Sequence, residues 1–264
     1  MELKILAVGD VVGSNGLELL RRRLRPLRRL HGVDLCVVNG ENVAGVGLLP
    51  QHAESLLDAG ADVITLGNHS YRCRQIADYL DDCPRILRPA NDSPRFPGRG
   101  LGVFETEVGS VAVLNLIGRC NMPFGPDNPF LLAEKLLRGL DTRLILVDFH
   151  AEATSEKLAM GYHLDGRVSA VWGTHTHVPT ADHQILPKGT GYVTDLGMTG
   201  PIRSVLGVRI EQSIAGFRGE LTSRFESAPG PCKLEAVLFT IDAGTGVCTH
   251  TERILYHDTN DARG

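Results

Sequence analysis

The sequence predicts an α/β fold built from two packed β-sheets with helices on their outer faces. Short apolar segments of strand type alternate with helical patterns in the first half of the chain, which is typical of parallel βαβ units. In the second half, pairs of strand-like segments are separated by short turns rich in glycine, which is typical of β-hairpins. We expect residues 1–264 to form a single domain, because no linker, internal repeat or low-complexity segment divides the chain.

The first half of the chain is predicted to alternate three strands with three helices. Apolar residues of strand type predict strands at 4–8, 35–38 and 63–66. The helical patterns lie at 17–30, 50–59 and 75–80. The first helix carries leucines on one face, and the second begins at a proline and ends near a glycine.

The second half of the chain mixes hairpins with further helices. Strands at 102–108 and 111–117 flank one turn, and strands at 235–241 and 247–254 flank another. Between these hairpins the pattern predicts helices at 129–140 and 155–162, strands at 144–147 and 169–172, and a short strand pair at 185–186 and 192–194. Helix-separated strands combined with hairpins favour two sheets packed together, with the helices outside.

The composition argues against a nucleic-acid-binding or membrane-embedded protein. Lys and Arg number 27 against 31 Asp and Glu, so the net charge is -4 and offers no overall attraction to nucleic acid or to an anionic membrane. We therefore expect no stable nucleic-acid binding and no membrane association, whereas a homo-oligomer remains compatible with this composition. The six cysteines include no CxxC pair, which indicates reduced thiols and a cytoplasmic location.

Five of the predicted strands end in side chains that bind metals. Ligand crevices of open α/β sheets lie outside the carboxyl ends of the strands, and a glycine before the polar residue allows a sharp turn there. Each motif alone is more often a capped or surface polar group, but five coincidences at equivalent positions favour one shared site. The side chains are Asp10, then Glu41 and Asn42, then Asn68 and His69, then His150, and finally His175 and His177.

This set of donors predicts a metal centre. Two carboxylates in one crevice repel each other and resist desolvation unless a cation lies between them. Oxygen and imidazole donors without thiolate suit manganese, iron or zinc. Seven candidate ligands are too many for one tetrahedral ion, whereas two ions that share a carboxylate would use them all. Paired ions about 3.5–4 Å apart are a common device for phosphoryl chemistry.

The same residues resemble the sequence blocks of the calcineurin-like metallophosphoesterases. Those blocks read roughly GD, GD or GE, GNH, H and GHTH, and they occur here at 9–10, 40–42, 67–69, 150 and 173–177. The stretches DFHAEATSEK, GTHTHVPTAD and TDLGMTGP are similar to the bacterial YmdB-like branch in particular. The resemblance covers nearly the whole chain. It implies a four-layer α/β/β/α sandwich with a binuclear metal centre between its loops.

The resemblance also implies how the ligands divide between two ions. It places Asp10, Glu41, Asn42 and His177 on one ion, and Glu41, Asn68, His150 and His175 on the other, with Glu41 bridging. The first block of the wider family usually reads Asp-x-His, whereas this chain has valine in place of the histidine, and Asn42 is the expected substitute. A glutamate also replaces the usual bridging aspartate. Iron is the first expectation for the metals, with manganese or zinc as alternatives.

The resemblance implies a binuclear metal-dependent phosphodiesterase that hydrolyses small 2′,3′-cyclic nucleotides. Hydroxide held between the two ions would attack phosphorus. His69, as an imidazolium, would protonate the leaving oxygen or hold the phosphate oxygens. Segments 45–47 and 195–201, together with Thr154, are expected to rim the substrate pocket. The alternative is a regulatory or binding protein that keeps the metal site and hydrolyses phosphate esters slowly or incidentally. The retained His69 favours catalysis, since a scaffold needs no acid.

Overall fold

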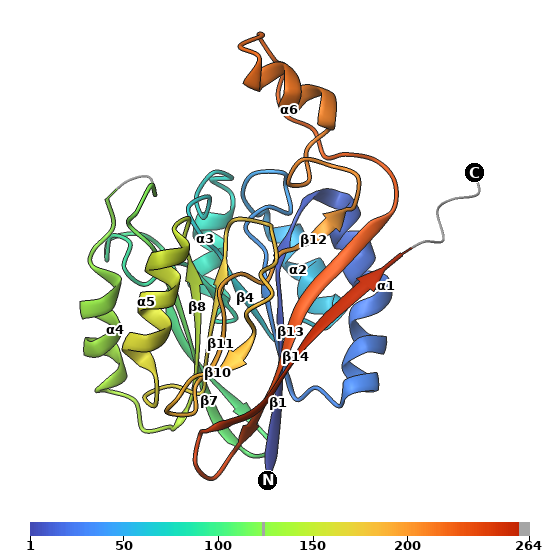
Figure 1. Cartoon of the computed structure of the whole chain (residues 1–264). Coiled ribbons are helices and arrows are strands. Elements are labelled where there is room, and N and C mark those ends of the chain that lie inside the picture. The colour runs from blue at the N-terminus through green and yellow to red at the C-terminus, as the bar shows by residue number, and fades with distance from the viewer. Residues whose placement is uncertain (123–124, 259–264) are drawn as a thin grey trace.

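The chain forms two β-sheets that pack face to face, with helices on the two outer faces (Figure 1). The computed structural model describes residues 1–122 and 125–258. The predicted α/β fold with two sheets is confirmed. The layers follow the order α/β/β/α that the family resemblance implied.

The first sheet is built around parallel strands from the first half of the chain. Its order is β2-β12-β13-β1-β3-β4-β5, with β14 paired to β13. Strands β1, β3, β4 and β5 are parallel, as the βαβ pattern predicts, and the hairpin strands β13 and β14 are antiparallel. The strands are β1 (Glu2–Val8), β2 (Asp10–Val11), β3 (Leu35–Asn39), β4 (Val63–Thr65), β5 (Ile86–Leu87), β12 (Met198–Pro201), β13 (Cys232–Asp242) and β14 (Cys248–His257).

The second sheet has the order β10-β11-β9-β8-β7-β6. Its centre is parallel, because β7, β8, β9 and β11 run in the same direction. The predicted hairpin around residue 109 joins β6 to β7. The strands are β6 (Leu101–Thr106), β7 (Gly109–Ile117), β8 (Leu144–His150), β9 (Ala170–Thr174), β10 (Gln184–Ile185) and β11 (Gly191–Val193).

The helices cover the outer faces of both sheets. Helices α1 (Gly13–His31), α2 (Pro50–Ala59) and α3 (Ile76–Asp82) contribute to the core beside the first sheet, and α4 (Pro129–Leu137) and α5 (Thr154–Leu164) to the core beside the second. Helix α6 (Ile210–Phe217), which the sequence pattern does not predict, stands away from the two sheets (Figure 1). Within the described residues, none of the helices has the length and apolar character that crossing a bilayer requires.

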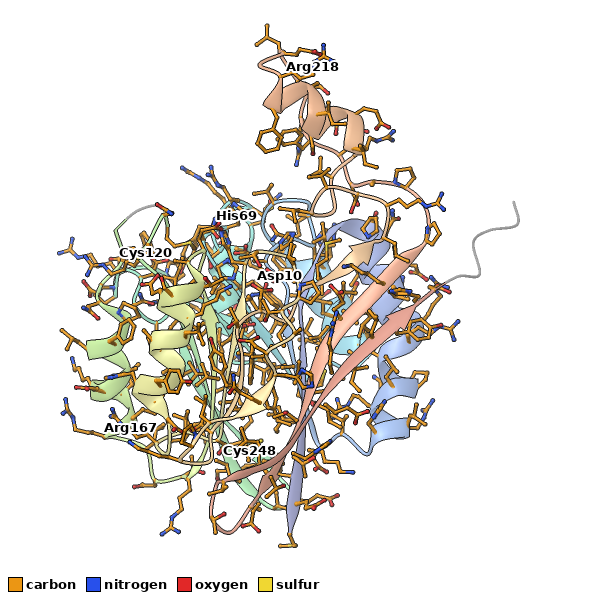
Figure 2. The ribbon with its side chains drawn as sticks, in the orientation of Figure 1. Asp10, His69, Cys120, Arg167, Arg218 and Cys248 are labelled. Atoms are coloured by element: carbon orange, nitrogen blue, oxygen red, sulfur yellow. The ribbon has the colours of Figure 1, made fainter. Side chains whose placement is uncertain are left out.

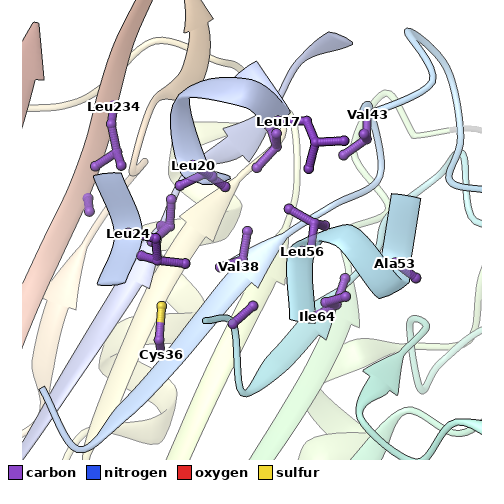
Figure 3. Close-up of a cluster of buried hydrophobic side chains, with 14 of the residues drawn as sticks. Leu17, Leu20, Leu24, Cys36, Val38, Val43, Ala53, Leu56, Ile64 and Leu234 are labelled. Atoms are coloured by element: carbon purple, nitrogen blue, oxygen red, sulfur yellow. The ribbon is translucent and has the colours of Figure 1, made fainter. Parts of the chain in front are cut away.

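Alternating side chains on the strands fill three separate cores. On β1, Leu3 and Ile5 face the space between the sheets, whereas Leu6 faces the helices. The core between the sheets includes Trp172 and Phe239, whose rings stack with centroids 5.9 Å apart. Figure 3 shows the core beneath α1 and α2, to which leucines such as Leu24 contribute. Truncation of a fully buried leucine to alanine typically costs about 2–5 kcal/mol.

This architecture brings the predicted ligands to one end of the molecule. The segments that follow β1, β3, β4, β8 and β9 emerge at the carboxyl edges of the parallel strands. Figure 2 shows Asp10 and His69 in the half of the molecule from which α6 projects. The crevice between the ends of the two sheets is therefore the place where a shared site can form.

Candidate metal centre

Asp10 lies where its own chain segment comes very close to the segment that contains Gly197. A Cβ atom on Gly9 would lie 2.3 Å from the carbonyl oxygen of Gly197, so only glycine fits before Asp10. The Asp10 amide donates to that same oxygen at 3.1 Å. The Asp10 side chain is fully buried, and its Oδ1 atom has no hydrogen-bond partner among residues 1–122 and 125–258. A buried carboxylate oxygen without a partner is costly, and it favours the binding of a cation or a hydrogen-bond donor at this position.

Glu41 and Asn42 follow β3 and lie beside Asp10. The Glu41 amide donates to Asn39 Oδ1 at 3.1 Å, which fixes the turn after the strand. The Glu41 side chain is buried, and its Oε1 atom accepts a hydrogen bond from Asn42 Nδ2 at 3.2 Å. The two predicted ligands from this strand end therefore point into the same space.

Only glycine fits at position 67, which follows β4, for a steric reason. A Cβ atom on Gly67 would lie 2.2 Å from His150 Nε2 and 2.4 Å from Glu41 Oε2. The absence of a side chain at Gly67 lets these two groups approach each other. The backbone amide of His69 donates to Glu41 Oε2 at 3.2 Å, so the same turn also supports the glutamate.

Four of the predicted ligands meet around one atom of His150. His150 Nε2 lies 3.1 Å from Glu41 Oε1, 3.0 Å from Asn68 Oδ1 and 3.1 Å from His175 Nδ1. Donor atoms of Glu41, His150 and His175 all lie within 4.8 Å of one another. This grouping coincides with one of the two ligand sets that the family resemblance implied.

The other implied set also converges. His177 Nε2 lies 3.7 Å from Asp10 Oδ1 and 3.1 Å from Asn42 Nδ2. Asn42 also contacts Glu41, which joins the two sets. The structure thus brings all seven predicted ligands together, although they come from five separated segments of the chain.

The outer nitrogen of His150 is held by a chain of hydrogen bonds. Thr174 Oγ1 donates to Asp148 Oδ1 at 2.7 Å, so the same hydroxyl oxygen can accept from His150 Nδ1 at 3.0 Å. A proton on Nδ1 leaves the lone pair of Nε2 directed at the cluster. Asp148 also accepts a hydrogen bond from Thr65.

The other two histidines are oriented in the same manner. His177 Nδ1 donates a hydrogen bond to the carbonyl oxygen of Leu206 at 3.0 Å. The lone pair of His177 Nε2 is therefore available to bind a cation. His175 Nε2 lies 3.1 Å from Glu152 Oε2, which leaves Nδ1 facing His150. Metal-binding histidines commonly have their second nitrogen held by a carboxylate or a carbonyl group in this way.

The segment that carries His175 and His177 has an unusual backbone. Their φ angles are 100° and 62°, in the left-handed region that costs non-glycine residues about 1–3 kcal/mol. The His175 amide donates to Asp10 Oδ2 at 3.1 Å, and Thr176 Oγ1 donates to Asp195 Oδ2 at 2.7 Å. These bonds hold both imidazoles toward the crevice.

A buried ion pair supports the segment that carries His175 and His177. Lys157 Nζ lies 2.6 Å from Asp195 Oδ2, and both side chains are shielded from solvent. Asp195 Oδ1 also accepts from the amide of Gly197 at 2.8 Å. The expectation that 195–201 rims the pocket is therefore wrong, because these residues are buried and Asp195 supports the metal-facing turn. Residues 45 and 46 line a separate cavity near Phe225, and Thr154 begins α5.

The buried carboxylates of the cluster favour a positive charge on a neighbouring group. Burial raises the pKa of Asp10. Burial alone would also raise the pKa of Glu41, but the imidazoles of His150 and His69 hold it well below its usual range. Burial opposes a charge on His150, yet the Glu41 carboxylate raises the pKa of His150 to about 9. Burial and the charge on His150 lower the pKa of His175 to about 3.

The residues fit a metal centre of oxygen and nitrogen ligands. The unpaired Asp10 oxygen, the buried Glu41 carboxylate and three imidazoles with one nitrogen free supply the donors that manganese, iron and zinc accept. Sequence reasoning did not identify the residues that orient them, which are Thr174, Asp148, Glu152 and Lys157. One signal was present for Asp148, because a carboxylate inside an apolar strand must have partners.

Comparison with known proteins identifies the family. The chain matches the model of the YmdB-like protein family over residues 6–254. It is 45% identical, over 97% of this chain and 98% of the relative, to a protein of Bacillus subtilis (strain 168) named 2′,3′-cyclic-nucleotide 2′-phosphodiesterase. A crystal structure of a novel phosphatase from Mycoplasma pneumoniae superposes with a TM-score of 0.92 at 37% identity, covering 97% of this chain and 94% of that one.

A second solved structure gives the same result. A hypothetical protein from Thermus thermophilus superposes with a TM-score of 0.91 at 36% identity, and the match covers 97% of this chain and 100% of that one. The chain therefore belongs to the YmdB-like family of calcineurin-like metallophosphoesterases.

Proposed function

We propose that this protein is a binuclear metal-dependent phosphodiesterase that hydrolyses small 2′,3′-cyclic nucleotides. The observation that carries the proposal is the convergence of seven oxygen and nitrogen donors on one crevice, with Glu41 in contact with both groups. The 45% identity to a relative named 2′,3′-cyclic-nucleotide 2′-phosphodiesterase supports the choice of substrate.

Each of the two groups of donors would hold one cation. Asp10, Asn42 and His177 would hold the first ion, and Asn68, His150 and His175 the second, with Glu41 shared between them. The cations held by these residues would supply the polarisation of the phosphoryl group and the lowered pKa of water that ester hydrolysis requires. Iron is the first choice for this donor set, with manganese or zinc as alternatives.

His69 is the residue best placed to handle the proton of the leaving group. Its side chain is 25% exposed, and its Nδ1 atom lies 3.4 Å from Glu41 Oε1. Nδ1 also lies 3.2 Å from Asn42 Oδ1, so this nitrogen is directed inward. Nε2 contacts Asn68 Nδ2 at 3.1 Å, and a substrate oxygen that enters there would replace this contact. As an imidazolium, His69 would then donate the proton of Nε2 to the ribose oxygen that leaves phosphorus, and it would keep the proton of Nδ1.

A phosphodiester panel with and without chelator tests this proposal. Purified protein should hydrolyse 2′,3′-cyclic AMP, lose that activity on prolonged treatment with EDTA, and regain it on addition of manganese or iron. Full metal loading without measurable turnover on any phosphodiester or monoester would contradict the proposal and indicate a protein that only binds its ligand.

A further inference from the structure

A cavity of about 550 Å³ opens directly beside the candidate metal centre. Gly67 and Asn68 line its mouth, and Asn68 Oδ1 lies 3.0 Å from His150 Nε2 within the cluster. The cavity is larger than a phosphate group needs and falls in the range of about 300–1,000 Å³ that is usual for small-molecule sites. The proposed phosphate chemistry uses Asn68 and none of the lining residues from 91 to 96.

An aromatic pair forms one wall of this cavity. The rings of Tyr71 and Phe96 have centroids 5.0 Å apart and meet edge to face. Tyr71 is fixed, because its hydroxyl donates to the carbonyl oxygen of Pro97 at 2.7 Å. Phe96 is 45% exposed, although phenylalanine is usually buried. An exposed ring beside a reaction site offers a stacking surface for a flat heterocycle.

The loop that carries Phe96 is held in place by buried polar contacts. Arg88 is buried and donates from Nη1 to the carbonyl oxygen of Pro89 at 2.8 Å and from Nη2 to that of Phe96 at 3.4 Å. Asn91 accepts from the Ile117 amide at 2.8 Å and donates to the Asp127 carbonyl oxygen at 2.9 Å. The cavity wall is therefore formed before any ligand enters, which lowers the entropic cost of binding.

Polar groups lie beside the aromatic wall. Asp92 and Ser93 line the cavity together with Arg72. Burial raises the pKa of Asp92, which shows that its carboxyl group is partly removed from water. A partly buried carboxylate accepts hydrogen bonds strongly. Nucleobases carry matching N–H donors, which are the amino groups of adenine, guanine and cytosine and the ring N–H groups of guanine and uracil.

We propose that this cavity binds the base of a nucleotide whose phosphate lies at the metal centre. The base packs against Phe96, and its N–H groups donate to Asp92. This inference rests on the proposed phosphodiesterase function. It predicts that purine nucleotides bind better than pyrimidine nucleotides, because a larger ring buries more area against Phe96.

Substitution of Phe96 tests the proposal with two substrates. Phe96→Ala should lower kcat/KM for 2′,3′-cyclic AMP about 5- to 100-fold, which is the usual effect of removing one stacking ring. The same variant should hydrolyse glycerol 1,2-cyclic phosphate, which has no base, as fast as the wild type does. Tyr162→Ala, which removes an exposed aromatic residue from α5 outside the cavity, should change neither rate.

The outcomes separate a base subsite from a structural role. Equal losses on both substrates, or no loss on either, would overturn the proposal. Phe96→Leu keeps the bulk of the side chain without its aromatic face, and it should show most of the loss while the Tm stays at the wild-type value. Asp92→Asn should change the ranking of the four cyclic nucleotides, and an unchanged ranking contradicts the part assigned to Asp92.

A binding measurement keeps the test independent of catalysis. Calorimetry with 3′-AMP should give a Kd that is about 5- to 100-fold weaker for Phe96→Ala than for the wild type. If the wild type hydrolyses neither cyclic substrate, the proposed function is wrong, and this measurement still decides whether the cavity binds a base. An identical Kd for the two proteins would remove the base subsite.

Discussion

His150 Nε2 lies 3.1 Å from Glu41 Oε1, at a place where the exposed fractions of the two side chains are 0% and 1%. Neither group would hold its charge there alone, since each would lose its hydration without compensation. The pair exists because Gly67 has no side chain and because Thr174 fixes the outer nitrogen of His150. The predictions below test this arrangement and the groups that support it.

Gly67→Ala should abolish metal binding while the fold is retained. The added Cβ atom would lie 2.2 Å from His150 Nε2 and 2.4 Å from Glu41 Oε2, so one of these side chains must move. Metal content after dialysis against manganese, together with a circular dichroism spectrum, measures the effect. Gly139→Ala is the matched control, because the nearest atom to its Cβ would be 3.6 Å away. Equal metal content in the two variants would disprove the steric argument.

His69→Ala should separate proton transfer from metal binding. We expect full metal content, because His69 supports Glu41 through its backbone amide, which the substitution leaves intact. Loss of a general acid should lower kcat about 10²–10⁴-fold on 2′,3′-cyclic AMP. On a p-nitrophenyl ester the loss should be small, because that leaving group needs no proton. An equal loss on both substrates would show that His69 acts in another way.

Glu152 should act on the metal only through His175. Glu152→Ala removes the acceptor that lies 3.1 Å from His175 Nε2, and loss of such a partner typically weakens metal affinity about 10-fold or more. Glu152→Gln keeps an acceptor oxygen and should restore most of that affinity. Competition with a chromophoric chelator measures both variants. If Glu152→Gln is as weak as Glu152→Ala, the hydrogen bond is not the cause.

The buried ion pair beneath the metal-facing turn should matter more than any surface pair. Lys157→Met leaves Asp195 buried and uncompensated, which costs about 3–5 kcal/mol in the free energy of unfolding. Arg218→Ala breaks an exposed pair with Glu220 and should change that free energy by no more than about 0.5 kcal/mol. Urea denaturation of both variants in the presence of EDTA measures the difference without a contribution from bound metal. Similar values for the two variants would contradict the role of Lys157.

Asp182 should give the fold a dependence on pH that its amide variant lacks. Burial opposes ionisation, but hydrogen bonds from Thr180 and Thr194 lower the pKa of Asp182. A lowered pKa stabilises the fold above the unfolded value of about 4, and this stabilisation is lost as the pH falls through the folded value. At pH 7, Asp182→Asn should therefore unfold more easily than the wild type, by about 1 kcal/mol, because solvent screens this half-exposed group and asparagine keeps one acceptor oxygen.

Urea denaturation at pH 7 and at pH 3 measures this dependence. The difference between wild type and Asp182→Asn should shrink at the lower pH, where the wild-type carboxyl group begins to bind a proton. A difference that stays constant between the two pH values would show that the carboxylate charge is not what stabilises this segment.

The convergence of the seven side chains was predictable because their signal in the sequence is local. An apolar strand, a glycine and a polar residue lie next to one another in sequence, as at Val8, Gly9 and Asp10. A parallel sheet then places the carboxyl ends of its strands, and these polar residues, at one edge. The parallel pairing of β1, β3 and β4 followed from the alternation of strand and helix patterns. The division of the ligands into two sets came from the family resemblance, because sequence spacing alone does not say which strand ends lie closest.

The supporting residues were not predictable, because their partners are distant in sequence. Lys157 reads as an ordinary polar residue of α5 until the fold places it against Asp195. Strand β12 was missed for a similar reason. It contains Gly200 and Pro201, which disfavour strands, and it forms because Met198 pairs with Asp10 of β2. Helix α6 has only eight residues and stands away from the sheets. Its sequence therefore has no long row of apolar residues facing the core from which a helix could be predicted.

Metal stoichiometry of the wild type and of Glu41→Gln tests the central claim most directly. Elemental analysis of the wild-type protein after loading and gel filtration should give two metal ions per chain, and Glu41→Gln should lose both, because Glu41 contacts both groups of donors. No bound metal in the wild type, or a Glu41→Gln variant that retains two ions, would contradict the account.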